Sequence, residues 1–279
     1  MKTIAIPDEL NSDTSLSINL FDYRSLKELS KQQVVLHKNT FSFLREGTKE
    51  VFFDDSSLSI DSTEFLLMKS GHCIMTEKLS EVNSNYNSVL LFFGNESVLK
   101  FIRKFELHKS ELTNYQSVYS FQYDPFIKRF VHSLLDILKL SKTTQKHILE
   151  VKFEELMLYL LEMRGTDFIY SLINNNDNQT RKFIQTVEHN QFNKLSLKEL
   201  AFLCNMSVSS FKREFKKHYA ESPIKWFQDK RLGYACRLLK DEHKRPSDIY
   251  LEVGYENLSS FVQAYKSKYG ITPKQHHKA

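Results

Sequence analysis

Short apolar runs bounded by turn-forming residues fill the chain from about Leu20 to Phe101. The runs that read as strands are QVVLHKN, TFSFLREG, EVFFDD, EFLLMKSG and NSVLLFFG, separated by glycines and by Asp, Ser and Asn clusters. Brief strands at this spacing predict a small antiparallel barrel or sandwich.

From Pro125 the apolar residues recur at helical spacing instead. PFIKRFVHSLLDILKL and TTQKHILEVKFEELMLYLLEMRG predict two helices, with Gly165 expected to end the second. Their apolar positions are Phe126, Ile127, Phe130, Val131, Leu134, Leu135 and Leu138, then Ile148, Val151, Phe153, Leu156, Leu160 and Leu161. Helices this apolar need a covering surface. They either pack within the chain or pair with a second copy in a homodimer, and the sequence leaves both open.

The polar stretch NNNDNQT, residues 174–180, reads as an interdomain linker, and nearly everything beyond it is helical. We therefore expect an α+β protein of two domains. Residues 1–173 would form a regulatory domain, a small antiparallel β-barrel of the cupin-like type with dimerisation-type helices at about 125–165. Residues 181–279 would form an all-α domain.

The stretch LSLKELAFLCNMSVSSFKREFKK predicts a helix-turn-helix. Ser196 and Glu199 have the spacing of a capping box at a helix start, CNM supplies the turn, and Ser207 is a good N-cap for the next helix. In that helix Val208, Phe211 and Phe215 would face inward, which leaves Ser209, Lys212, Arg213 and Lys216 outward. Such a helix can enter a DNA major groove, which is about 12 Å wide.

A second copy follows in RPSDIYLEVGYENLSSFVQAYKSKYG. Gly254 suits a left-handed turn, and Asn257 can cap the next helix. Phe261 and Tyr265 would be core, whereas Ser259, Ser260, Gln263 and Lys266 would face out. The stretch PIKWFQDKRLGYACRLL predicts a linker helix, with Trp226 in its core, that holds the two motifs at a set separation. Two such units about 34 Å apart would meet successive major grooves.

Charge is divided unevenly along the chain. The 279 residues carry a formal net charge of +5. Residues 181–279 hold 19 Lys and Arg against 10 Asp and Glu, a balance of +9, and the first 180 residues have a balance of −4. A basic domain after a mildly acidic one indicates that the second domain meets a polyanion.

Residues 181–279 resemble the DNA-binding domain of the AraC/XylS family of transcription regulators. The resemblance is carried by LSLKELA, MSVSSFKREFKK, SPIKWFQDKRLGYACRLL and DIYLEVGYENLSSFVQAYKSKYGITP, in that order. By position, it places base reading on Ser209, Lys212 and Arg213 in the first motif, and on Leu258, Ser259 and Gln263 in the second. Lys216, Lys217 and Lys266 are expected to contact phosphate, because a point charge positions the protein without specifying a base.

The chain departs from the family pattern at several positions. Ala220 stands where Gly is usual, Tyr250 where a small Ala is usual, and Gln263 where Arg is frequent. Gln263 can still pair with adenine in a bidentate manner. His276 and His277 replace a common Tyr-Arg and are expected to form a frayed tail.

The N-terminal region resembles the regulatory domains of the same family more loosely, through EFLLMKSGHCIMTEK. The resemblance implies an activator whose partners are double-stranded DNA, RNA polymerase and either a small-molecule effector or a regulatory protein. The sequence does not identify the effector or its binding residues, and it implies no cofactor.

An enzyme with an accessory helical domain is the alternative reading. It lacks a nucleophile motif, a phosphate-binding glycine loop and a metal cluster, and the chain has only 7 Gly. His72 beside Cys73 has no His-x-His companion, and nothing nearby indicates a reactive thiol, so we expect neither a metal site nor a redox sensor. The widely spaced cysteines, with no signal peptide and no apolar run long enough to span a membrane, indicate a cytoplasmic protein.

Overall fold

The computed structural model describes residues 3–10, 16–108, 116–173 and 179–277. The chain divides into two compact units, Met1–Lys182 and Phe183–Ala279. Most of the predicted linker, residues 174–178, lies outside the described residues, and Gln179 and Thr180 form the start of a helix.

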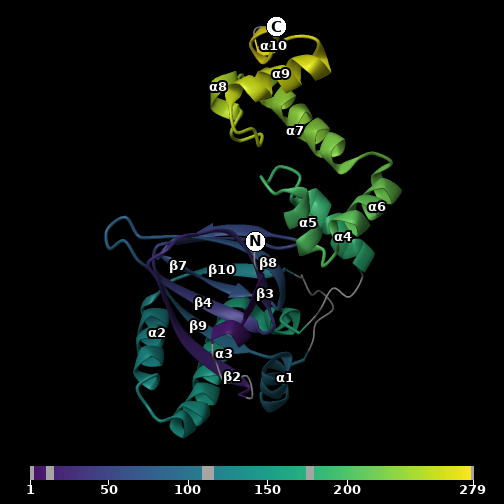
Figure 1. The fold of residues 1–279 in the computed structure, drawn as a ribbon. Coiled ribbons are helices and arrows are strands. Elements are labelled where there is room, and N and C mark those ends of the chain that lie inside the picture. The colour runs from purple at the N-terminus through teal and green to yellow at the C-terminus, as the bar shows by residue number, and fades with distance from the viewer. Residues whose placement is uncertain (1–2, 11–15, 109–115, 174–178, 278–279) are drawn as a thin grey trace. The chain divides into compact units, whose positions relative to one another are not determined.

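The first unit is built on two five-stranded sheets (Figure 1). The outer sheet has the order β1 (Ile4–Ile6), β3 (Leu29–Leu36), β8 (Gly71–Lys78), β5 (Thr48–Phe52), β6 (Ser57–Ile60). The central sheet has the order β10 (Val118–Gln122), β7 (Glu64–Met68), β4 (Asn39–Glu46), β9 (Tyr86–Phe93), β2 (Ile18–Ser25). The described strand pairs are antiparallel apart from β1 and β3, which run parallel. A strand-rich domain is confirmed, but its strands form two sheets rather than a closed barrel.

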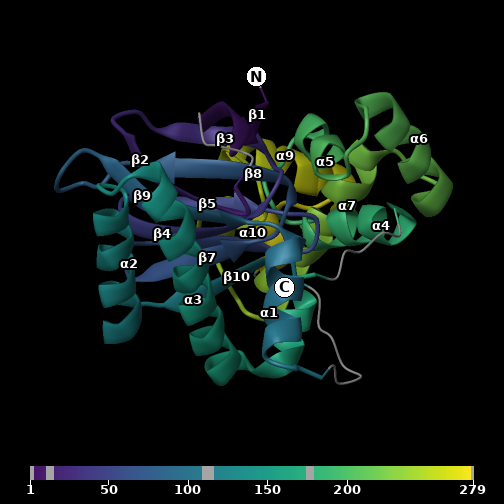
Figure 2. The same ribbon diagram turned by 90° about the horizontal axis from the view of Figure 1, so that it is seen from below.

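The central sheet is apolar on both faces, which explains why a third layer exists. Along β7, Phe65 and Leu67 belong to a core shared with helices, whereas Leu66 and Met68 belong to the core between the sheets. A strand buried on both faces reads as a continuous apolar run rather than an alternating one. Helices α1 (Asn95–Lys104), α2 (Pro125–Ile137) and α3 (Lys142–Ser171) form the covering layer (Figures 1 and 2).

The two predicted helices are present as α2 and α3, and their main apolar faces pack within the chain. Phe130, Leu134 and Phe153 are buried in the core that these helices share with the central sheet. Val151 lies outside that core, with 64% of its surface exposed. Gly165, at φ 76° and ψ 177°, is not helical: the first helical segment of α3 ends there, as expected, and a second segment continues across a kink. Helix α1 was not predicted, because its residues follow a strand directly and fall inside the region that reads as strands.

The second unit is helical, as expected. Its helices are α4 (Gln179–His189, which begins in the first unit), α5 (Leu197–Leu203), α6 (Val208–Tyr219), α7 (Pro223–Lys240), α8 (Pro246–Ile249), α9 (Leu258–Tyr269) and α10 (Pro273–His277). One end of α7 supplies Trp226 and Phe227 to an aromatic cluster with Phe215. Its other end supplies Leu232, Ala235 and Leu238 to a core with α9. The predicted linker helix is therefore confirmed, and it belongs to both motifs.

Across the residues the structure describes, no helix is both long and apolar enough to cross a bilayer.

Candidate nucleic-acid interface

Helix α6 presents a polar, cationic face to solvent because its aromatic face is buried. The Ser207 hydroxyl accepts a hydrogen bond from the Ser210 amide at 3.1 Å, which fixes the helix start. Phe211 and Phe215 are fully buried. The predicted contact residues Ser209, Lys212, Arg213, Lys216 and Lys217 are all exposed. Their sequence spacing brings Ser209, Lys212, Arg213 and Lys216 to one side of the helix.

Helix α5 and the turn that follows it set the direction of α6. Ser196 and Glu199 form the predicted capping box: the Ser196 amide donates to the Glu199 carboxylate at 2.6 Å, and the Glu199 amide donates to the Ser196 hydroxyl at 3.3 Å. Asn205 adopts φ 54°, and the Met206 amide donates to the Ala201 carbonyl at 2.9 Å. The buried Ala201 side chain is small enough for this close return of the chain.

The cationic side chains of α6 differ in whether they have a carboxylate partner. Lys217 lies 3.5 Å from the Glu214 carboxylate, which His218 also approaches at 3.0 Å. The hydrogen bond from His218 lowers the pKa of Glu214, so this carboxylate stays charged. Lys212, Arg213 and Lys216 have no ion-pair partner among the described residues. These three side chains are therefore available to an anion.

Helix α9 repeats the geometry of α6 with fewer charges. The Asn257 side chain accepts from the Ser260 amide at 2.8 Å, and Phe261 and Tyr265 are fully buried. The predicted contact residues Leu258, Ser259, Gln263 and Lys266 are exposed. The helix that precedes this turn, α8, is one short turn, and Gly254 takes the expected left-handed conformation at φ 87°.

The expectation of a frayed tail at His276 and His277 is wrong. Both residues lie in α10, and His276 Nδ1 and the Tyr265 hydroxyl share a hydrogen bond of 2.6 Å. Burial lowers the pKa of His276 and raises that of Tyr265. The histidine therefore anchors the C-terminal helix to the buried side of α9. The hydroxyl of a buried tyrosine on α9 needs a hydrogen-bond partner. The helical spacing of apolar residues predicts that the tyrosine is buried but does not identify that partner.

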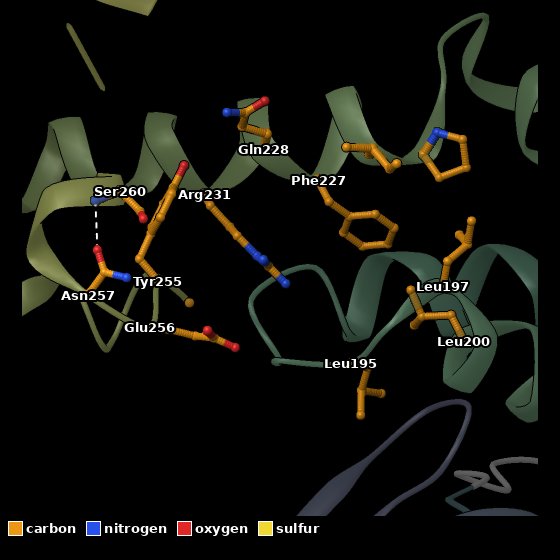
Figure 3. Close-up of a pocket in the computed structure, with 13 residues that line it drawn as sticks. Leu195, Leu197, Leu200, Phe227, Gln228, Arg231, Tyr255, Glu256, Asn257 and Ser260 are labelled. Carbon is orange, nitrogen blue, oxygen red and sulfur yellow. Dashed lines mark hydrogen bonds between the residues drawn. The ribbon is translucent and has the colours of Figure 1, made fainter. Parts of the chain in front are cut away.

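A pocket of about 480 Å³ separates the two motifs within the second unit (Figure 3). Leu195, Leu197 and Leu200 line it from the first motif, Phe227, Gln228 and Arg231 from α7, and Tyr255, Asn257 and Ser260 from the second motif. Arg231 extends from α7 into this space. Sequence reasoning did not single it out, because an arginine on a basic helix looks like an ordinary surface residue.

The first unit contains a smaller, partly open cavity of about 110 Å³, lined mostly by aliphatic residues. Lys49 and Glu77, both nearly fully buried, face each other there at 3.1 Å. In the part of the chain that the structure describes, the second oxygen of Glu77 and the hydroxyl of Tyr86 are buried without a hydrogen-bond partner. Burial and the Glu77 charge raise the pKa of Tyr86 well above its usual value. No local motif marks Lys49 or Glu77, because only the pairing of β5 with β8 brings them together.

Cys73 is buried in the core between the sheets, and burial raises the pKa of its thiol. Burial also lowers the pKa of the neighbouring His72. The described residues include no group of three or more His, Cys, Asp or Glu side chains placed to hold a metal ion.

Two family models match separate parts of the chain. Residues 39–171 match the ExsA N-terminal regulatory domain, and residues 200–279 match a helix-turn-helix domain. The first match covers most of the two sheets with α1 to α3, and the second begins inside α5 and covers the rest of both helix-turn-helix motifs.

Individual proteins and one solved structure are similar to the chain to different extents. The virulence regulon transcriptional activator VirF of Yersinia enterocolitica is 28% identical over 156 residues, 56% of this chain and 57% of VirF, so the match spans little more than half of that protein. The HTH-type transcriptional regulator ExsA of Pseudomonas aeruginosa is 22% identical over 83% of each chain. The solved structure of an apo ToxT variant from Vibrio cholerae aligns with 94% of this chain and 97% of its own, at 12% identity and a TM-score of 0.44.

The double helix-turn-helix, its exposed cationic helix and the two family models lead to one conclusion: the chain joins an N-terminal domain of the ExsA type to a helix-turn-helix domain of the AraC type, the arrangement of its relatives among the AraC family regulators.

Proposed function

We propose that the chain is a sequence-specific DNA-binding transcription regulator, and an activator rather than a repressor. The observation that carries the proposal is the exposed face of α6, where three cations lack ion-pair partners among the described residues. The names of VirF and ExsA support activation and transcriptional regulation. We infer a cytoplasmic regulator that works with RNA polymerase, not an enzyme.

Within this proposal the two motifs divide the work. Ser209, Lys212 and Arg213 read bases from α6, and Leu258, Ser259 and Gln263 read them from α9. Lys216, Lys217 and Lys266 bind phosphates and set the register of the protein on the duplex. Arg213 is the reader we expect to matter most, because an arginine can pair with guanine through two hydrogen bonds.

The test is selection of genomic DNA fragments by the purified full-length chain, at low and at near-physiological salt. We expect a shared motif with two half-sites about one helical turn apart. Binding that is lost at the higher salt and leaves no shared motif would show that the helical unit is only an electrostatic anchor. Repeating the selection with residues 181–279 would then show whether the first unit suppresses specific binding.

We further propose that the cavity beside Lys49 and Glu77 takes a small amphipathic effector. An unsatisfied buried polar group costs about 1–3 kcal/mol, and the second oxygen of Glu77, a residue that lines this cavity, is such a group among the described residues. A ligand with a hydroxyl or amine donor and an apolar body would satisfy both this oxygen and the aliphatic walls. A regulatory protein bound to the unit's surface is the competing idea.

The products of the selected target genes supply the compounds to test for this effector. We expect one of them to raise the melting temperature of the full chain, and we expect Glu77→Gln to abolish that rise. A compound that raises the melting temperature of both chains equally binds elsewhere and would contradict the assignment.

A homodimer through α3 is a separate proposal. The main apolar faces of α2 and α3 are used within the chain, but Val151 and Leu158, seven positions apart on α3, remain exposed. Sedimentation at micromolar concentration, with and without DNA, tests it. We expect a dimer that Leu158→Glu disrupts, and a monomer under all conditions would rule it out.

A further inference from the structure

Arg231 contacts both helix-turn-helix motifs at once. Its Nη2 donates a hydrogen bond of 2.8 Å to the carbonyl of Asn193, in the segment that leads into α5. On its other side lies Gly254, in the turn that leads into α9. A Cβ atom added to Gly254 would lie 3.1 to 3.3 Å from Nε, Cζ and Cδ of Arg231. One side chain on the linker helix therefore reaches the segment that leads into the first motif and the turn that leads into the second recognition helix.

Both surfaces that Arg231 touches are themselves fixed. The Asn193 side chain donates to Asn190 at 2.9 Å, and the buried Asn190 side chain donates to the Thr186 carbonyl on α4 at 2.9 Å. In the second motif, Tyr255 follows Gly254 and its ring packs on Phe261 of α9, with centroids 5.4 Å apart. A shift of either motif relative to α7 would therefore be opposed by the Arg231 guanidinium.

A contribution to stability does not by itself explain an arginine at position 231. Its Nε is buried and has no hydrogen-bond partner among the described residues, and burial lowers the pKa of the guanidinium. For a half-buried cation with incomplete hydrogen bonding, the cost of desolvation offsets much of what its one hydrogen bond contributes to stability. The contacts of Arg231 with both motifs instead suit a role in placing them.

The linker helix also contains a weak point close to Arg231. Gly233 lies inside α7, near the place where the buried face of the helix passes from Phe227 in the first core to Leu232 in the second. A Cβ added to Gly233 would meet no atom within 4 Å, so close packing does not require glycine. Glycine weakens a helix interior relative to alanine, and glycine positions are among those where helices bend.

We propose that Arg231 sets the separation of the two recognition helices, and therefore the half-site spacing that the chain accepts, while Gly233 lowers the resistance of α7 to bending between the two motifs. The inference rests on the proposed DNA-binding function and adds a spacing determinant that does not itself touch a base. Arg231 is a positioning residue in this scheme, since it acts through α6 and α9.

The test compares three variants of the full chain on duplexes built from the selected motif, with the spacer lengthened or shortened by one or two base pairs. Arg231→Met should reduce the preference for the best spacer over its neighbours by about tenfold, as loss of one charge-assisted hydrogen bond implies. Gly233→Ala should sharpen that preference. Arg237→Met, which removes an exposed arginine from the same helix, is the matched control and should leave it unchanged.

A second measurement needs no DNA. Spin labels at Lys217→Cys and Ser267→Cys, in a Cys236→Ser background that leaves two buried cysteines, report the distance between α6 and α9. We expect Arg231→Met to broaden the distance distribution and Gly233→Ala to narrow it.

The outcomes separate the inference from the function on which it rests. An equal loss of affinity for every spacer, or an unchanged spacing profile with unchanged distances, would overturn the role of Arg231. If the wild-type chain selects no motif at all, the proposed function fails, and the label distances alone still show whether Arg231 fixes the separation.

Discussion

The two helix-turn-helix motifs share a framework and differ in what they expose. Each recognition helix has 12 residues, a side-chain N-cap, two buried aromatic residues and a left-handed C-terminal residue. The first helix of the first motif, however, has seven residues and a complete capping box, whereas the first helix of the second motif has four residues and no side-chain cap. The first motif also has Lys212 and Arg213 at the positions where the second has Val262 and Gln263. Shared geometry therefore does not imply shared strength, because the exposed chemistry differs.

The largest expected effect of this difference is at Arg213. Arg213→Ala should weaken binding to the selected motif by about 1–3 kcal/mol and relax specificity at one position. Gln263→Ala should cost less, because it removes no charge. Competition binding against the selected motif and against random DNA measures both variants. An equal loss on both DNAs would reassign Arg213 to phosphate, and a larger loss for Gln263→Ala would reverse the ranking of the motifs.

The C-terminal residues of the recognition helices allow a stability comparison. Ala220 and Gly270 both adopt left-handed backbone, at φ 55° and 76°. Because a side chain is strained there, Ala220→Gly should stabilise the chain by about 0.5–1 kcal/mol, and Gly270→Ala should destabilise it by about 1 kcal/mol. Urea unfolding followed by the fluorescence of Trp226, the single tryptophan, reports on the helical unit. Changes of the same sign in both variants would contradict this account.

A smaller effect separates two adjacent lysines. Lys216 has no ion-pair partner among the described residues, whereas Lys217 lies beside Glu214. Lys216→Ala should weaken binding to all sequences alike, by a few-fold, and reduce the slope of log affinity against log salt by about 0.9. Lys217→Ala should reduce the slope by less. Titrations at four salt concentrations decide this, and discrimination between sites by either variant would show that it reads bases.

The smallest effect concerns pH and the second motif. Burial holds the pKa of His276 below its ordinary value of 6.5, so the unfolded chain takes up this proton first as the pH falls. The His276 contribution to stability is therefore complete above pH 6.5 and is lost as the pH falls through the lowered value. Urea unfolding at pH 7.5 and 5.5 should show a smaller loss for His276→Gln than for the wild type. An equal loss would assign the pH dependence to other groups.

Most of what could be predicted about these motifs depends on local sequence patterns. The caps at Ser196, Ser207 and Asn257, the turn at Gly254 and the inward aromatic residues each depend on neighbours within a few positions, and the structure has all of them. The exposure of the expected contact residues follows from the same helical period.

Long-range contacts account for what could not be predicted. The bond between Tyr265 and His276 depends on how α10 folds back, and the Lys49–Glu77 pair depends on the register of β5 against β8. Arg231 meets Asn193 across 38 positions. Helix α1 escaped prediction for a local reason: its apolar residues continue a strand-like run with only Gly94 between them.

The doubly buried central sheet also has a consequence for how the chain must be made. All eight residues of β9 are buried, and its face toward the helices is covered by residues that follow it in the chain. During synthesis, or in a shortened fragment, that apolar face is uncovered until α2 and α3 are complete. A large exposed apolar face favours association with other chains. Soluble fragments of the first unit should therefore extend at least through Ser171.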